Sequence, residues 1–206
     1  MTFYNVHFSL FWVLISLQNA KGLDAAAKIR YTSDNTIWEK RKETDMQQQN
    51  AREVFSRSRW IWSEAHPGND DYAEFYAELP SGEPTLCRLS CDGDYTLFIN
   101  GRYAASNQYG DYEHYKIYDE LDLTPFLREG RNDFALLVWH FGASSQRYIP
   151  AQAGVIFELV QKGKPVLASG PAVLCRRSRA YRSGECRCIT RQLGFGFAYD
   201  ATREDG

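Results

Sequence analysis

The sequence contains no apolar run long enough to cross a bilayer. Residues 8–17 (FSLFWVLISL) form a run of ten residues, whereas a transmembrane helix needs about 20. The run fits the core of a signal peptide ending at Ala20, although no Lys or Arg precedes it and Gln18 is unfavourable there. A non-native or strand-like extension explains residues 1–20 equally well. The localisation stays open, secreted or periplasmic with a cleaved signal and cytoplasmic without one, and we expect no membrane partner.

An excess of charge of either sign is also missing. The chain has 24 Lys and Arg against 26 Asp and Glu, a net charge of −2, which argues against nucleic acid as the main partner. The local exception is an arginine cluster near the C-terminal end. A solvated strand face and a docking surface both explain this cluster, which comprises Arg176, Arg177, Arg179, Arg182, Arg187 and Arg191.

The cysteines form no recognisable framework. Five is an odd number, so no complete set of disulfides is implied. Cys87 and Cys91 would share one face of an expected strand, as would Cys186 and Cys188. Neither pair has the His or the second Cys-x-x-Cys that would complete a zinc site. We therefore predict buried free thiols and no zinc.

Motifs that carry catalysis are absent too. The four histidines form no HExxH or HxH pair, and His140 is expected to be structural, at the end of a buried strand. There is no serine elbow, phosphate loop or dinucleotide fingerprint. Two aspartate pairs at expected turns could bind Ca²⁺ but belong to no complete calcium loop; they are Asp70 with Asp71 and Asp92 with Asp94. We expect no catalytic residue, no other cofactor, and no turnover by this chain alone.

What the sequence does contain is a period of two from Arg59 onward. Such alternation is typical of half-buried antiparallel strands, and an aromatic content of 15% suits both a β core and sugar-facing surfaces. In residues 72–79 one face comprises Ala73, Phe75, Ala77 and Leu79, and the other comprises Tyr72, Glu74, Tyr76 and Glu78. Further strands are expected at 86–91, 95–99, 134–139, 155–160 and 165–168, with short strands recurring to 195–199.

Turn signals separate these strands. Asp92-Gly93-Asp94 marks one turn, and Asn100-Gly101 indicates a type I′ hairpin because both of its central residues need positive φ. Residues 59–206 are thus predicted to form an all-β domain, an antiparallel β-sandwich or jelly roll. Residues 21–58 are expected to form a polar arm, with a surface helix over residues 38–55.

One connection, residues 104–116 (AASNQYGDYEHYK), is longer than a tight turn and lacks strand periodicity until its end. Long loops at the edge of a sandwich often carry binding residues. Its tyrosines offer stacking faces and its polar side chains offer hydrogen bonds to hydroxyls. If the chain binds a sugar, the candidate residues are Asn107, Tyr109, Asp111, Tyr112 and Tyr115. The competing interpretation is that these tyrosines cover the sandwich edge or face another domain.

Several motifs resemble a known family. They are Trp60-Ile61-Trp62, the run from Asp92 to Gly101, Tyr118-Asp119 with Gly130 and Asn132, Trp139-His140-Phe141-Gly142, and Gly154-Val155-Ile156-Phe157-Glu158. In this order they resemble the N-terminal domain of bacterial α-L-rhamnosidases, over residues 59–206. The resemblance implies a galactose-binding-like sandwich in which the motif residues are structural; these are Asp94, Tyr95, Asn100, Gly101, Asp119, Gly130 and Asn132.

In that family the catalytic carboxylates lie in a helical (α/α)6 barrel, to which no position of this chain corresponds. The resemblance therefore implies a non-catalytic accessory module, present as a fragment, that recognises substrate or braces the barrel. Its implied partners are a rhamnose-containing glycan or other carbohydrate, and the barrel. Two alternatives are a free-standing lectin-like protein and the jelly-roll domain of a β-galactosidase-like enzyme. Exposed apolar surface would favour a docking role, and a polar, well-finished surface would favour the lectin.

Overall fold

Two antiparallel sheets form the body of the protein. The computed structural model describes residues 54–79, 83–108, 116–146, 148–190 and 192–204, which all belong to one unit, residues 46–206. The predicted signal segment, and nearly all of the predicted helix at 38–55, lie outside the described residues. Within the described part, no helix has the length and apolarity needed to cross a membrane.

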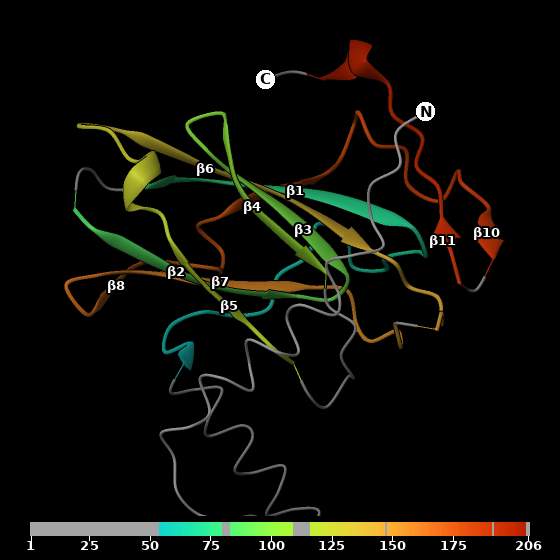
Figure 1. Cartoon of the computed structure of the whole chain (residues 1–206), viewed down its shortest axis with the longest axis horizontal. Helices are drawn as coiled ribbons and strands as arrows, with labels where there is room; N and C mark the ends of the chain where they lie inside the picture. The colour runs from blue at the N-terminus through green and yellow to red at the C-terminus, as the bar shows by residue number, and fades with distance from the viewer. Residues whose placement is uncertain (1–53, 80–82, 109–115, 147, 191, 205–206) are drawn as a thin grey trace, which may run out of the picture. The chain divides into compact units, whose positions relative to one another are not determined.

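The strands divide into two layers (Figure 1). The five-stranded sheet has the order β4 (Arg102–Gln108), β3 (Asp94–Ile99), β6 (Asn132–His140), β1 (Asp71–Leu79) and β9 (Leu174–Arg177). The four-stranded sheet has the order β5 (Asp119–Asp122), β2 (Thr85–Cys91), β7 (Val155–Gln161) and β8 (Lys164–Ala168). A small ribbon pairs β10 (Cys188–Thr190) with β11 (Gly194–Phe195), and 3-10 turns span Thr124–Phe126 and Ala201–Arg203. The predicted antiparallel β-sandwich is confirmed.

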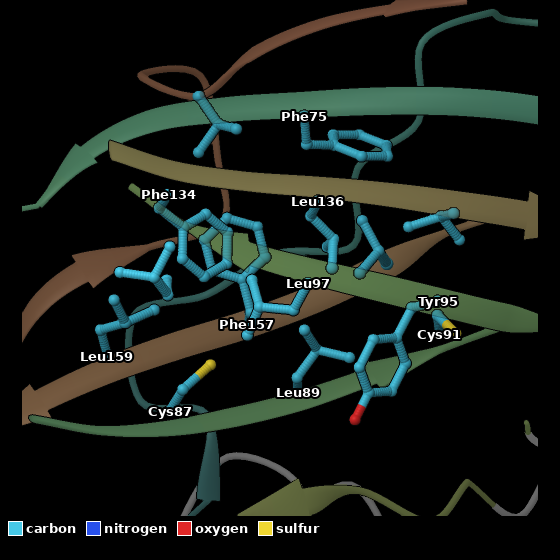
Figure 2. Close-up of a cluster of buried hydrophobic side chains, with 14 of the residues drawn as sticks. Phe75, Cys87, Leu89, Cys91, Tyr95, Leu97, Phe134, Leu136, Phe157 and Leu159 are labelled. Carbon is cyan, nitrogen blue, oxygen red and sulfur yellow. The ribbon is translucent and has the colours of Figure 1, made fainter. Parts of the chain in front are cut away.

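The core lies between the two sheets, because every second side chain of the strands points inward. Burial alternates along all nine residues of β6, because successive side chains of a strand point to opposite faces. Figure 2 shows side chains from both sheets meeting in this layer. The rings of Phe134 and Phe157 come from opposite sheets and lie 4.8 Å apart between centroids.

In β1 the predicted inward face is confirmed, but the outer face is less open than its pattern indicates. Tyr72 is only 5% exposed. Its ring stacks on Trp139 of the neighbouring strand at 5.7 Å and on Tyr181 at 5.0 Å. Since Tyr181 is 109 residues away, no local pattern predicts this cover.

The prediction of buried thiols holds for one of the two cysteine pairs. Cys87 and Cys91 are fully buried on the inner face of β2 (Figure 2), and burial raises the pKa of the Cys87 thiol, which stays neutral. The prediction is wrong for Cys188, which is exposed, and for Cys186, which is half-buried. Cys188 lies on β10, all three residues of which are exposed, and Cys186 precedes that strand.

The predicted loop at 104–116 also needs correction, because β4 occupies its first five residues. Phe98 pairs with Tyr103 and Leu97 pairs with Ala105, so Ala104 is an extra residue at a β-bulge. A bulge shifts the in-and-out alternation by one residue. This shift explains why the strand is not visible as a period of two.

The prediction of a hairpin turn between β3 and β4 is confirmed. Asn100 and Gly101 have φ of 54° and 72°. The Asn100 side chain donates to Asn132 Oδ1 at 2.8 Å, and Asn132 donates to the Gly130 carbonyl at 3.2 Å. These residues therefore close two turns against each other, as expected for structural motif residues.

The segment before β1 is held on the four-stranded sheet by one buried carboxylate. Glu158 on β7 is 2% exposed. It accepts hydrogen bonds from the backbone N–H groups of Ser56 and Arg57, at 3.3 and 2.8 Å, and from the hydroxyls of Ser56 and Ser58.

Replacing this anchor should loosen the segment. We expect Glu158→Gln to lower the free energy of unfolding by about 2 kcal/mol, because an amide carries no charge and presents a donor toward groups that also donate. Urea unfolding measures the loss, and limited proteolysis near residues 54–58 reports the release. Glu129→Gln, at an exposed position, is the control, and an equal effect there would contradict the anchoring role.

Candidate functional site

Four connecting segments converge at one end of the sandwich, which we call the loop end. There the first residue of β1 pairs with the last of β6, the first of β3 with the last of β4, and the last of β2 with the first of β7. The described residues that meet there are 62–70, 92–93, 116–118, 141–146 and 148–154. Sandwich folds commonly place binding residues in such loops because the sheets hold their ends in position.

A buried carboxylate lies at the centre of the loop end. Asp92 is fully buried. Its Oδ1 accepts from Lys116 Nζ at 2.8 Å, and its Oδ2 lies 2.8 Å from His140 Nδ1 and accepts from the Tyr148 hydroxyl. One side chain thus ties together three of the converging segments.

The pKa values at this centre follow from burial and partners. Burial alone would raise the pKa of Asp92, but the hydrogen bonds from His140, Lys116 and Tyr148 outweigh it and lower the pKa below its ordinary value. For Tyr148, burial and the adjacent Asp92 both raise the pKa. Asp92 is therefore an ion-paired carboxylate and Tyr148 a neutral donor, an arrangement that supports structure.

His140 occupies the position expected of a structural histidine. It is 5% exposed, and besides its contact with Asp92 its ring packs edge-on against Trp62, with centroids 6.0 Å apart.

Both ends of the segment 109–115 are fixed to the sheets. On the β4 side, Asn107 Nδ2 donates to both carboxylate oxygens of Asp119, at 3.0 and 2.9 Å. Asp119 also accepts from the hydroxyl of Tyr95, whose ring lies in the core (Figure 2). On the other side, Lys116 binds Asp92, and the Ile117 carbonyl accepts from Ser90 Oγ at 2.6 Å. Any group carried by this segment is thus presented from two anchored stems.

Of the predicted sugar-binding residues, the structure describes one. Asn107 is used to hold the stem through Asp119. Tyr109, Asp111, Tyr112 and Tyr115 lie outside the described residues, and their role stays a prediction.

Of the aspartates predicted at turns, Asp70, Asp71 and Asp92 are buried structural groups, and Asp94 is half-buried. Asp71 Oδ1 accepts from Arg177 Nε at 2.8 Å. Asp70 has a φ of 54° and accepts from Trp139 Nε1 at 2.9 Å, and burial raises the pKa of its carboxyl. Across the residues that the structure describes, no group of three or more His, Cys, Asp or Glu side chains is placed to hold a metal ion. A calcium site therefore stays an untested prediction.

Three members of the arginine cluster form ion pairs within the chain. Arg176 pairs with Glu74 at 2.6 Å, Arg177 with Asp71, and Arg182 with Asp200 at 3.1 Å. Arg191 lies outside the described residues. These pairs favour a solvated face over a basic docking patch.

The C-terminal segment instead exposes apolar side chains. Four large ones from β9 onward are 62–70% exposed, which is unusual for side chains of this size; they are Leu174, Ile189, Leu193 and Phe197. Exposed apolar surface is the feature expected of a module that docks on another domain.

Sequence reasoning did not identify Lys116, Tyr148 or Asp92 as a cluster. Lys116 and Tyr148 lie 24 and 56 residues from Asp92 along the chain, and no motif spacing relates the three. The one local signal is Lys116, which ends a polar loop two residues before the motif Tyr118-Asp119.

Comparison with known proteins supports the fold and the resemblance. No protein-family model matches the chain, and no curated protein sequence matches it. Among solved structures, the GH78 family rhamnosidase of Bacillus sp. GL1 superposes with a TM-score of 0.66 and 28% identity over 72% of this chain. The α-L-rhamnosidase of Aspergillus terreus superposes with a TM-score of 0.56 and 17% identity over 72% of this chain.

The chain spans only a small part of these enzymes, 16% of the first and 19% of the second. The lower identity of the second shows a shared fold alone. The expected resemblance to rhamnosidases is confirmed at the level of one portion of such an enzyme. Over most of its length, this β-sandwich is similar to a segment that makes up less than a fifth of a GH78 rhamnosidase.

Proposed function

We propose that this protein is a non-catalytic accessory module of an α-L-rhamnosidase-like glycoside hydrolase, which contacts a carbohydrate at the loop end. The observation that carries the proposal is the double anchoring of residues 109–115 through Asn107–Asp119 and Lys116–Asp92. Tyrosine and polar side chains offer stacking faces and hydrogen bonds to a saccharide, and anchored flanking residues lower the entropic cost of presenting them.

Two further observations support this proposal. The likeness to the Bacillus enzyme makes a rhamnose-containing glycan the first ligand to test. The exposed apolar residues of the C-terminal segment favour a module of a larger assembly over a free-standing lectin. The catalytic carboxylates would belong to another domain, so this chain contributes recognition or support and not bond cleavage.

Calorimetric titration of the full chain with methyl α-L-rhamnopyranoside and rutinose tests the proposal. We expect binding by the native chain, weakened about tenfold in Tyr109→Ala and in Tyr112→Ala, because each loses one stacking face. Galactose serves as the comparison sugar. No p-nitrophenol should be released from p-nitrophenyl α-L-rhamnopyranoside.

Two results would count against this assignment. Unchanged titrations in both variants would remove these tyrosines from the site. Absence of saccharide binding by the native chain would end the recognition role.

A further inference from the structure

The indole of Trp60 is an exposed ring on a fixed support. The residue is 46% exposed. A Cβ added at Gly154 would lie 2.9 Å from Cε3 of Trp60 and 3.7 Å from Cζ3. The indole therefore packs directly on the backbone of a buried glycine, and the absence of a side chain there makes room for it.

The backbone on both sides of Trp60 is hydrogen-bonded to the four-stranded sheet. Arg59 N donates to the Ser169 carbonyl at 2.8 Å, and Ser169 Oγ donates to the Arg59 carbonyl at 2.7 Å. Ile61 and Val155 exchange backbone hydrogen bonds of 3.0 and 3.1 Å. The ring thus projects from a segment held at its two neighbouring residues, which lowers the entropic cost of binding to it.

The hydrogen bonding of its indole N–H distinguishes Trp60 from the other tryptophans that the structure describes. Trp62 Nε1 donates to Asp71 at 3.4 Å and Trp139 Nε1 donates to Asp70 at 2.9 Å. Within the described part of the chain, the Trp60 N–H has no such acceptor. Trp60 combines an open aromatic surface with a hydrogen-bond donor available to a ligand.

The ring also lies next to the candidate site. The indole packs on Gly154, and the carbonyl of this glycine accepts from Asp92 N at 2.9 Å. The Asp92 carboxylate in turn binds Lys116, which directly follows residues 109–115. A ligand held by that segment and a ligand on Trp60 would therefore share one end of the sandwich.

We infer that Trp60 is a stacking platform for a pyranose ring, a sugar contact that extends the proposed site and rests on the proposed function. The C–H face of a pyranoside packs on an indole, and a ring hydroxyl can accept from its N–H. The four residues before Trp60 in sequence are polar, and Arg57 and Arg59 among them are exposed. Such a setting suits an amphipathic ligand such as a saccharide better than an apolar protein surface.

Titration of the full chain with methyl α-L-rhamnopyranoside and rutinose distinguishes this role. Trp60→Ala should weaken binding about tenfold, while Trp60→Phe, which keeps a ring, should stay within about threefold of the native affinity. Gly154→Ala should also weaken binding, because the added methyl group displaces the indole. The native chain should show a ligand-dependent change in tryptophan fluorescence that Trp60→Phe lacks.

Tyr103→Ala is the matched control, since Tyr103 is 58% exposed on the hairpin at the opposite end of the sandwich, and it should titrate like the native chain. Thermal unfolding of each variant separates lost binding from lost folding. If the native chain binds and Trp60→Ala binds equally well, Trp60 is excluded while the proposed function stands. If the native chain binds neither saccharide, both fail.

Discussion

Replacing Asp92 with alanine is expected to lower the free energy of unfolding by about 3–5 kcal/mol, the range for breaking a buried ion pair. The change removes a fully buried carboxylate, which is a shared partner of His140, Tyr148 and the Lys116 ammonium. Lys116 is itself only 18% exposed in its side chain, so water replaces the lost partner poorly. Urea or guanidinium unfolding measures the difference.

The matched control is Glu120→Ala on β5. Glu120 pairs with Arg88 at 2.9 Å, but both side chains are substantially exposed, and an exposed pair contributes about 1 kcal/mol or less. Combining Asp92→Ala with Lys116→Met should cost less than the sum of the single changes, because each single change already removes the contact between the two side chains. If Asp92→Ala and Glu120→Ala lower the free energy of unfolding equally, burial does not make the Asp92 ion pair more important for stability.

The Asp92 centre should also make stability depend on acid. The pKa of Asp92 is lowered in the folded state, so its contribution is fully present above the unfolded value of 3.8 and is lost as the pH falls through the folded pKa. The difference in unfolding free energy between the native chain and Asp92→Asn should therefore be constant above about pH 5 and shrink as the pH falls below that value toward the lowered folded pKa. Asp70, whose pKa is raised by burial, acts in the opposite direction and cancels in this comparison. A difference that is constant with pH would contradict an ionised Asp92.

Gly93→Ala is the second change with a large expected effect. Gly93 has a φ of 108°, and a Cβ there would lie 2.1 Å from the Trp139 carbonyl oxygen and 3.2 Å from its carbonyl carbon. Both contacts are with backbone of the central strand β6, which cannot rotate away. Backbone strain and overpacking together should cost about 3 kcal/mol or more. Soluble yield and the denaturation midpoint report the loss.

Gly101→Ala provides the comparison within the same fold. Gly101 also has a positive φ, 72°, but a Cβ added there meets no atom within 4 Å. Only the left-handed backbone penalty applies, about 1 kcal/mol. If the two alanine variants lose the same stability, the close approach to Trp139 is not what selects glycine at position 93.

Much of the sandwich could be predicted because its determinants are local. The inward face of β1, the alternation along β6 and the Asn100-Gly101 turn each depend on φ, ψ and the direction of successive side chains. One exception has a local cause, because the bulge at Ala104 disguises β4. The other does not, because the ring of Tyr181, 109 residues away, covers Tyr72 on a face that its pattern marks as open.

The sequence by itself determined where the strands run, which faces they bury and where the chain turns, because these properties follow from a few neighbouring residues. Only the tertiary structure decided that Asp92 gathers Lys116, His140 and Tyr148, and that Trp60 lies on Gly154. These partners are 24 to 94 residues apart. Their contacts exist because two sheets bring their strand ends together, and no spacing along the chain records which strand ends will meet.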